Sequence, residues 1–290
     1  MMTKIIDGKQ IANKIKEEVR ENTAKLYKDK GIKPGLAILL VGNDPASESY
    51  VRSKERNSEN MDFHFVMERR DSNIAEDEVL NLIDQWNNDD EIHGILIQLP
   101  LPKHIDENKV LLKINPDKDV DGFHPVNLGR LVIGLEGLVP CTPAGIVELL
   151  KRSDIETKGK HVVVLGRSNI VGKPVANLLY QKKEGANAIV TICHSAADDV
   201  FQYTKQADIL IVAIGSANFI KDEHIKEGCA IIDVGINRID ADNEKGYEIV
   251  GDVDFNSVIG KASAITPVPG GVGPMTIAML MNNTYKSASQ

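Results

Sequence analysis

The sequence predicts a two-domain α/β fold, because short apolar segments of strand length alternate with segments of helical periodicity along most of the chain. Several of these apolar segments are continuous, as expected of parallel strands that are buried on both faces. With 290 residues, the chain is long enough for two domains of ordinary size. We therefore expect mostly parallel sheets with helices packed against them.

The overall composition excludes several classes of protein. A formal charge of −8 and an isoelectric point near 5.4, without a basic cluster, argue against nucleic acid as a partner. The three cysteines are widely spaced and form no C-x-x-C pair, so we expect neither disulfides nor a metal site but a reducing, cytoplasmic location. No apolar run approaches membrane-spanning length, and we expect no signal peptide and no membrane partner.

The first half of the chain alternates helices and strands. Residues 9–27 carry Ile11 and Ile15 at helical spacing among charged residues, which predicts an amphipathic helix. The segments that follow are predicted as strand 36–41, helix 46–60, strand 63–67, helix 74–86 and strand 94–99. Tyr50 and Lys54 are four residues apart on the second helix and therefore share a face.

Gln98 lies at the carboxyl end of the otherwise apolar strand 94–99, just before Pro100-Leu-Pro102. In open α/β sheets, ligands bind at the carboxyl ends of parallel strands. This position favours a role for Gln98 in a site. A side chain that only bonds a neighbouring loop would fit the same pattern.

Residues 117–122, Asp-Lys-Asp-Val-Asp-Gly, resemble the start of a calcium-binding EF loop. The ninth position of such a loop would be Pro125, and the twelfth, which needs a bidentate glutamate, would be Leu128. The sequence therefore excludes a calcium loop. On local evidence, Asp121 fits a solvated loop and a packed, functional position equally well.

The second half continues the alternation. Its predicted elements are helix 144–150, strand 162–165, a helix beginning near Gly172, strand 188–193, helix 198–206, strands 209–213 and 229–234, a hairpin around 240–246 and a final helix 275–283. Residues 267–274 contain three prolines and three glycines, and we expect a rigid loop rather than helix or strand. Domain boundaries are expected near residues 120–140 and near 270, with the last helix returning to the first domain.

Residues 162–174 indicate a strand, a tight turn and a helix start, a combination that offers backbone N–H groups to a phosphate. The match to the dinucleotide fingerprint G-x-G-x-x-G is imperfect, because Ser168 replaces the second glycine and the last one falls at Gly172. A packed turn without a ligand is the alternative. A hydrolase nucleophile elbow is excluded, since Ile170 stands where the G-x-S-x-G motif needs glycine.

The strand at 188–193 helps to distinguish the two dinucleotide cofactors. It is followed by His194 and Ser195, where a NAD site usually has an acidic residue for the ribose hydroxyl. Arg167 and Ser195 can instead hold the 2′-phosphate of NADP. The local chemistry therefore favours NADP.

Six motifs occur in the order found in one enzyme family. They are Tyr50-Val-x-x-Lys54, Ile97-Gln-Leu-Pro-Leu-Pro102, Asp119-Val-Asp-Gly-Phe-His124, Pro140-Cys-Thr-Pro143, Gly166-Arg-Ser168 and Pro269-Gly-Gly-Val-Gly-Pro-Met-Thr276. Together they resemble the bifunctional methylenetetrahydrofolate dehydrogenase/cyclohydrolase family, from Ile6 to Thr284. Chance agreement of six ordered motifs is remote, so the resemblance outweighs the alternatives left open for each motif alone.

The resemblance implies two α/β domains with a cleft between them. A folate-binding catalytic domain would comprise residues 1–138 and 271–290, and a Rossmann-type NADP-binding domain would comprise residues 139–270. The implied enzyme oxidises 5,10-methylenetetrahydrofolate with NADP to the methenyl cation, and then hydrolyses this cation to 10-formyltetrahydrofolate. The family also implies a homodimer.

The resemblance also assigns site residues by position. The implied catalytic residues are Tyr50, Lys54, Gln98 and Asp121. Further substrate-binding residues would be Val51, Ile97, Leu99, Pro269, Gly270, Gly271, Val272 and Thr276. The residues implied to bind NADP are Gly166, Arg167, Ser168, Ser195 and Ile236, and no metal is implied.

These residue types suit the implied chemistry. Asp121 would accept hydrogen bonds from the amino-pyrimidine edge of the pterin, and Tyr50 would stack against the folate ring system. A lysine is a poor base at neutral pH unless it is desolvated or lies near positive charge, which the methenyl cation supplies. Lys54 would then take a proton from the attacking water, and Gln98 would orient Lys54 without raising its pKa as a carboxylate would.

Two other functions fit parts of the same pattern. One is a dehydrogenase with little cyclohydrolase activity, which a separate measurement of methenyl-folate hydrolysis would distinguish. The other is a folate- or NADP-binding protein without catalysis. The presence of both Lys54 and Asp121 argues against this second alternative.

Overall fold

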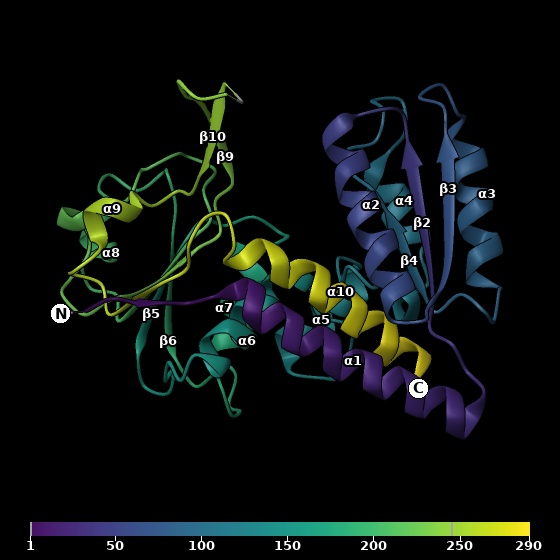
Figure 1. Cartoon of the computed structure of the whole chain (residues 1–290), viewed down its shortest axis with the longest axis horizontal. Coiled ribbons are helices and arrows are strands. Elements are labelled where there is room, and N and C mark those ends of the chain that lie inside the picture. The colour runs from purple at the N-terminus through teal and green to yellow at the C-terminus, as the bar shows by residue number, and fades with distance from the viewer. Residues whose placement is uncertain (1, 245) are drawn as a thin grey trace. The chain divides into compact units, whose positions relative to one another are not determined.

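The computed structural model describes residues 2–244 and 246–290, which form two compact units (Figure 1). The six-stranded unit contains the chain up to Ala12 together with Thr142–Thr276. The three-stranded unit contains Asn13–Cys141 and Ile277–Gln290. This division differs from the predicted boundaries at the N-terminus, because the first strand pairs with a strand of the six-stranded unit.

The six-stranded sheet is parallel throughout, as the continuous apolar segments predicted. Its strand order is β1-β11-β8-β7-β5-β6. The strands are β1 (Lys4–Ile5), β5 (His161–Leu165), β6 (Ile189–Cys193), β7 (Ile209–Val212), β8 (Ala230–Asp233) and β11 (Ala264–Ile265). Because β5 has β6 on one side and β7 on the other, the strand order reverses at β5, and the carboxyl ends of β5 and β7 meet at a position where α/β sheets bind ligands.

Short helices and one hairpin complete this unit. The helices are α6 (Cys141–Arg152), α7 (Gly172–Leu179), α8 (Phe201–Thr204), η2 (Asp222–His224) and α9 (Phe255–Val258). The predicted helix 198–206 is therefore limited to one turn. The predicted hairpin is confirmed, since β9 (Asn237–Asp240) and β10 (Tyr247–Val250) pair antiparallel.

The three-stranded sheet has the order β3-β2-β4 and is also parallel. Its strands are β2 (Gly35–Val41), β3 (His64–Arg70) and β4 (Gly94–Ile97), and the helices that follow them are α2 (Pro45–Asn60), α3 (Glu76–Asn87), α4 (Glu107–Lys113), η1 (Pro116–Lys118) and α5 (Pro125–Ile133). Val79 of α3 and Val110 of α4 pack against Ala37 and Leu39 in one core cluster. Helix α2 lies on the opposite face of the sheet (Figure 1).

Two long helices contribute residues to both units: α1 (Gly8–Lys30) and α10 (Val272–Ala288). The prediction of a loop over 267–274 was wrong for its last three residues, which form the start of α10. Pro274 is the third residue of that helix, where the N–H that proline lacks would have no partner within the helix. The helix also extends past the predicted end, to Ala288.

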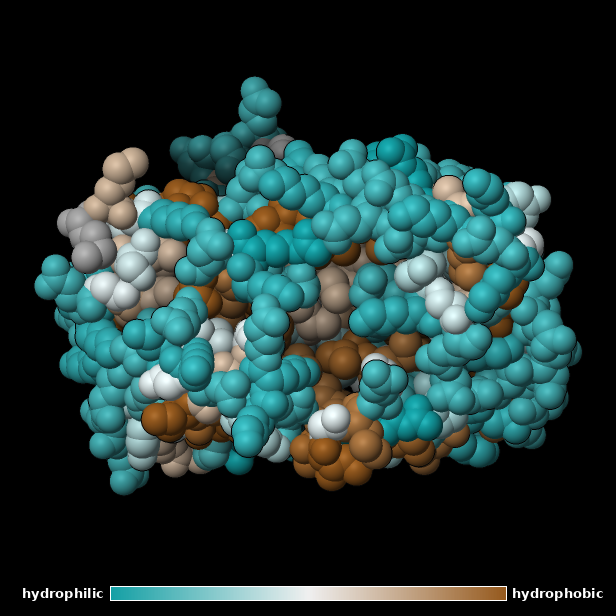
Figure 2. All heavy atoms as spheres, turned by 90° about the horizontal axis from the view of Figure 1, so that it is seen from below, coloured by the Kyte–Doolittle hydropathy of each residue, from teal (hydrophilic) through white to brown (hydrophobic). Residues whose placement is uncertain are grey.

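The surface agrees with the acidic, charge-rich composition. Figure 2 shows hydrophilic residues over most of one face, with hydrophobic atoms gathered in smaller patches. Within residues 2–244 and 246–290, no helix has both the length and the hydropathy needed to cross a membrane. The same residues contain no cluster of three or more His, Cys, Asp or Glu side chains that could hold a metal ion.

Candidate active site

Lys54 and Gln98 meet in the three-stranded unit. Lys54 lies on α2, and its Nζ donates a hydrogen bond of 2.9 Å to Gln98 Oε1. Gln98 follows the last residue of β4, and its backbone N–H donates to the carbonyl of Leu39 at 2.9 Å. The Gln98 Nε2 donates to the Leu99 carbonyl at 2.9 Å, which leaves Oε1 to face the lysine. The amide therefore contacts both Lys54 and the neighbouring loop, and the hydrogen bond to Lys54 is the one that the family resemblance implies.

The carboxyl group of Asp121 lies close enough to Lys54 for each charge to affect the other. Burial lowers the pKa of Lys54, and the negative charge of Asp121 opposes this decrease. Burial raises the pKa of Asp121 to about 6, against the effect of the Lys54 ammonium. Lys54 is thus closer to the neutral amine that a base requires than a lysine in water, while Asp121 is mostly ionised at neutral pH.

Two residues that the sequence analysis missed fix the backbone on either side of this carboxylate. Asn283, buried on α10, donates from Nδ2 to the Val120 carbonyl at 2.9 Å and to the Val139 carbonyl at 2.8 Å. Cys141, also buried, donates from Sγ to the same Val120 carbonyl at 3.3 Å. Both side chains hold the residue next to Asp121. Asn283 had no sequence signal, and Cys141 appeared only as a member of the motif Pro140-Cys-Thr-Pro143, because the partners of both side chains are carbonyl groups far away in the chain.

The other residues predicted to contact substrate in this unit differ in exposure. Tyr50 is 50% exposed, so its ring is accessible to a ligand. Val51 and Ile97 are buried in the core, and Leu99 packs at its edge. Their side chains therefore support α2 and β4. Among the predicted residues of this unit, Tyr50, Lys54, Gln98 and Asp121 carry the polar or aromatic groups suited to recognition.

The six-stranded unit has a cavity of about 390 Å³ at the carboxyl ends of β5 and β7. Gly166, Arg167 and Ser195, three of the residues implied to bind NADP, line it. Gly166 has φ +128°, and a Cβ there would lie 2.2 Å from the carbonyl oxygen of Ala213. Only glycine fits this turn. The lining also includes Ile214 and Ser216, two residues of the loop after β7 that the sequence analysis missed.

Ser168 has a local role in the same turn. Its Oγ accepts hydrogen bonds from the backbone N–H groups of Val171 at 3.1 Å and Gly172 at 3.3 Å, and its carbonyl accepts from Lys173 at 3.1 Å. The expectation that this helix start offers its N–H groups to a phosphate is therefore wrong for these three groups. Ser168 fixes the turn that presents Gly166 and Arg167.

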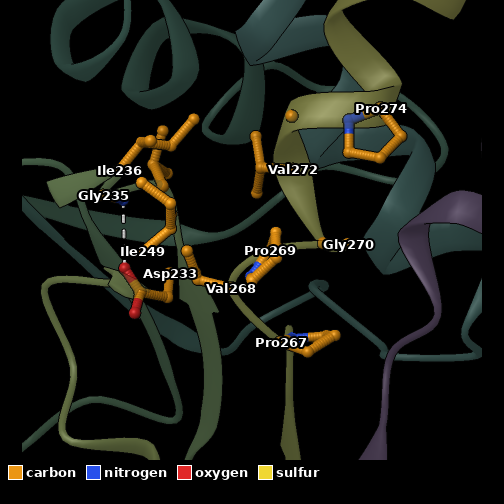
Figure 3. A pocket seen from close by; sticks show the side chains of 13 residues that line it. Asp233, Gly235, Ile236, Ile249, Pro267, Val268, Pro269, Gly270, Val272 and Pro274 are labelled. Atoms are coloured by element: carbon orange, nitrogen blue, oxygen red, sulfur yellow. Dashed lines mark hydrogen bonds between the residues drawn. The ribbon is translucent and has the colours of Figure 1, made fainter. Parts of the chain in front are cut away.

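A second, smaller pocket of about 160 Å³ in this unit joins residues predicted for two different ligands. Figure 3 shows Ile236 and Ile249 on one side of the pocket and Pro269 and Val272 on the other. Gly270 and Gly271 complete this part of the lining. A hydrogen bond fixes the loop that contains Gly270, because the N–H of Lys9 at the start of α1 donates to the Gly270 carbonyl at 3.0 Å.

Thr276 does not line this pocket. Its Oγ1 lies 2.9 Å from the Oγ1 of Thr142, a hydrogen bond that joins the start of α10 to α6. Ile236 is likewise separate from the larger cavity that contains Gly166. Apart from Ser168 and Thr276, which make structural hydrogen bonds, the predicted residues thus form three groups, one around Lys54 and one at each of the two pockets of the six-stranded unit.

Comparisons with known families agree with this arrangement. Residues 6–121 match the model described as "Tetrahydrofolate dehydrogenase/cyclohydrolase, catalytic domain". Residues 140–290 match "Tetrahydrofolate dehydrogenase/cyclohydrolase, NAD(P)-binding domain". The two models together cover most of the chain.

Individual relatives and solved structures are similar over the full length. The chain is 54% identical to the bifunctional protein FolD of Bacillus pumilus, covering 100% of this chain and 99% of the relative. A crystal structure of the bifunctional FolD enzyme from Campylobacter jejuni is 50% identical, with a TM-score of 0.93 and 99% of each chain covered. The Trypanosoma brucei FolD, solved in complex with NADP cofactor and inhibitor, is 38% identical with a TM-score of 0.92, covering 100% of this chain and 98% of that one.

Proposed function

Because the chain belongs to the tetrahydrofolate dehydrogenase/cyclohydrolase family, we propose that the group formed by Lys54, Gln98 and Asp121 is the catalytic centre of its two reactions. The protein is a bifunctional enzyme that oxidises 5,10-methylenetetrahydrofolate with NADP and hydrolyses the methenyl product to 10-formyltetrahydrofolate. The observation that carries the residue assignment is the 2.9 Å hydrogen bond between Lys54 and Gln98 beside the Asp121 carboxylate.

In the hydrolysis, Lys54 acts as the general base. Its pKa is already lowered by burial, and the positive charge of the methenyl substrate lowers it further when that substrate binds. The neutral amine takes a proton from water as the water oxygen bonds to the methenyl carbon. The same proton is then returned to the ring nitrogen as its bond to that carbon breaks. The hydroxyl left on the carbon loses its own proton to solvent as the formyl C=O forms, so the hydrolysis of the cation releases one proton. Gln98 keeps Nζ in place during both proton transfers.

Asp121 binds the substrate rather than the reacting carbon. Its carboxylate accepts hydrogen bonds from the amino-pyrimidine edge of the pterin, a pair of adjacent N–H donors that suits two carboxylate oxygens. With a pKa of about 6, the carboxylate is mostly ionised at pH 7 and can serve as this acceptor. Tyr50 stacks on the folate ring system, where such a contact contributes about 0.5–1.5 kcal/mol beyond area burial.

The larger cavity of the six-stranded unit suits NADP. Gly166 removes side-chain bulk where the backbone must approach a phosphate, and Arg167 and Ser195 are exposed in the lining to hold the 2′-phosphate. When bound, NADP accepts the hydride from the methylene carbon. We assign the six-stranded unit to NADP binding and the three-stranded unit to folate binding.

The smaller pocket is proposed as the place where the two ring systems meet. Hydride transfer requires the reacting carbons to lie about 3–3.5 Å apart. Ile236 was predicted to contact NADP, while Pro269, Gly270 and Val272 were predicted to contact folate, and all four line this one pocket. Its apolar walls exclude water from the transfer.

We also propose a homodimer in the cytoplasm. On the edge strand β6, Ile189 is 64% exposed and Ile192 is 41% exposed, so the edge of the sheet carries apolar side chains that a second copy of the chain would cover. Cys141, Cys193 and Cys229 are buried thiols without disulfides, as expected in a reducing compartment. The mass in solution, measured by light scattering, tests the dimer.

Two assays on the purified protein test the function. We expect NADPH to form only when methylenetetrahydrofolate and NADP are both present, and added methenyltetrahydrofolate to be hydrolysed faster than in buffer. If only the hydrolysis is observed, the protein is a cyclohydrolase without dehydrogenase activity. If only NADPH formation is observed, it is a dehydrogenase without cyclohydrolase activity. Binding of both ligands without either reaction would refute catalysis.

A further inference from the structure

Asp252 is a fully buried carboxylate beside the cofactor cavity, and its hydrogen bonds go mostly to the protein backbone. Its Oδ2 accepts from the N–H groups of Ile214 at 2.8 Å and Gly215 at 3.0 Å. Its Oδ1 accepts from the N–H of Ser216 at 2.8 Å and from Asn237 Nδ2 at 2.9 Å. One side chain therefore holds three consecutive peptide groups of the loop that follows β7.

This loop forms one wall of the cavity proposed to bind NADP. Ile214 and Ser216 both line the cavity, as do Gly166 and Arg167 of the turn after β5. Because Asp252 accepts hydrogen bonds from the N–H groups of Ile214 and Ser216, this wall offers only carbonyl groups and side chains to a ligand. The position of that wall depends on the position of the Asp252 carboxylate.

A second buried aspartate holds the backbone of the first. Asp233, the last residue of β8, accepts from the N–H of Asp252 at 2.9 Å and of Val253 at 3.0 Å. It also accepts from the N–H of Gly235 at 3.0 Å, the contact drawn in Figure 3. A Cβ on Gly251 would lie 1.8 Å from Asp233 Oδ2, so glycine is required where the two segments meet. The chain of contacts runs from β8 through Asp233 and Asp252 to the cavity wall.

The pair is expensive to bury, which argues for a role beyond packing. Burial, together with the nearby charge of Asp252, raises the pKa of Asp233 to about 7. The hydrogen-bond partners of the two carboxyl groups are backbone N–H groups and one amide, and no cation is among them. An apolar pair would fill the space without this cost, but it would leave the loop N–H groups without acceptors.

We propose that Asp252 is a positioning residue for NADP, which fixes the cavity wall at 214–216 and is itself fixed by Asp233. The proposal rests on the assignment of this cavity to NADP made above. It concerns the cofactor alone, because hydrolysis of the methenyl substrate consumes no NADP. The two reactions of one enzyme therefore provide separate measurements.

The test is Asp252→Asn in the full-length protein. Each carboxylate oxygen of Asp252 accepts two hydrogen bonds. In either orientation of the asparagine amide, its NH2 group therefore replaces one of these oxygens and leaves two N–H donors without their acceptor. We expect the KM for NADP to rise at least about tenfold, kcat at saturating NADP to fall less than about threefold, and the hydrolysis of methenyltetrahydrofolate to stay within about twofold. A purely structural role would reduce both reactions together with the folded fraction.

Asp254→Asn is the matched control, because it makes the same exchange two residues away. Asp254 caps α9 through a hydrogen bond from the Ser257 N–H, which asparagine also accepts, so no change in NADP affinity is expected. If Asp252→Asn does not fold, Asp233→Asn serves as the test of the proposal. The asparagine amide at position 233 can be oriented so that only the Val253 N–H loses its acceptor. A rise of about threefold in KM is expected there.

An unchanged KM for NADP in a folded Asp252→Asn protein, or equal losses of both reactions, would overturn the proposal. So would an unchanged KM in Asp233→Asn if that variant has to serve as the test. Failure of the wild-type protein to bind NADP would instead refute the assignment of the cavity, before any variant is compared.

Discussion

The two units build their sites from different parts of the chain. In the three-stranded unit, the groups proposed to form the catalytic centre are side chains: the amine of Lys54, the amide of Gln98 and the carboxylate of Asp121. In the six-stranded unit, the cavity is shaped by backbone, namely the turn at Gly166 and the loop at 214–216. We call the group around Lys54 the side-chain site and the cavity at Gly166 and 214–216 the backbone site. The first is proposed to provide functional groups, and the second to provide a cavity of the right shape.

This difference affects how each site responds to substitution. Removing a functional atom from the side-chain site should stop a reaction while the protein stays folded. Adding an atom to the backbone site should displace a wall and weaken binding, although no functional group is lost. Substitutions at the two sites should therefore differ in which activity they remove.

The largest effect is expected for Lys54→Met. The change keeps an unbranched side chain but removes the amine, so hydrolysis of the methenyl substrate should fall by about 10²–10⁴, the usual contribution of a general base. Folate binding, measured by calorimetry, should persist. Lys33→Met is the control, because Lys33 is an exposed lysine paired with Asp62 and should leave both reactions unchanged. Normal hydrolysis by Lys54→Met would remove this residue from the mechanism.

The backbone site is tested by Gly166→Ala. The new Cβ would meet the Ala213 carbonyl at 2.2 Å, so the turn must move, and we expect NADP affinity to fall about 100-fold while hydrolysis persists. Gly159→Ala separates crowding from backbone strain, since Gly159 also has positive φ, +69°, but nothing lies within 4 Å of the added atom. Equal effects of the two changes on NADP binding would show that crowding is not the cause.

Arg167→Ala tests the proposed charged contact to the cofactor. A charge-assisted hydrogen bond contributes about 1.5–3 kcal/mol, so NADP affinity should fall about 10- to 100-fold. Affinity for NAD, which lacks the 2′-phosphate, should change less than about threefold. Titration of each cofactor by fluorescence measures both values, and parallel losses would count against recognition of the phosphate.

The smallest effect is expected for Asp121→Asn, measured as thermal stability. The pKa of Asp121 is raised from 3.8 to about 6, so its contribution to stability is complete below pH 4 and is lost as pH rises through 6. Asparagine does not ionise, so the variant keeps this contribution to stability at high pH. We expect the variant to melt at a higher temperature than the wild type at pH 7, as for a gain of up to about 3 kcal/mol in the free energy of unfolding, with the gain vanishing near pH 4. A gain that does not depend on pH would contradict this account.

Much of the fold could be predicted because its signals are local. The apolar segments predicted the strands, and a positive φ requirement appeared as glycine at the end of β5. That Tyr50 and Lys54 share one helix face and that Gln98 stands at a strand end followed from spacing. The resemblance to a known family then supplied the reactions and the role of Asp121.

Other features had no local signal. Asn283 and Asp252 bond to peptide groups that are far away in the sequence, and such contacts leave no pattern of spacing or polarity. The N-terminal residues joined the six-stranded unit only through the pairing of β1 with β11. The end of the predicted loop became the first turn of α10, where proline is tolerated.

By itself, the sequence determined the α/β class, the parallel strands and the glycine turn after the strand at 162–165, because periodicity and residue type act over short distances. The residues proposed to carry the chemistry were assigned by the resemblance to a known family. Only the tertiary structure decided that Lys54, Gln98 and Asp121 share one environment with shifted pKa values, and that two buried aspartates hold the wall of the cofactor cavity. Burial and hydrogen bonds between distant segments arise when the chain packs, and so they cannot be assigned before it does.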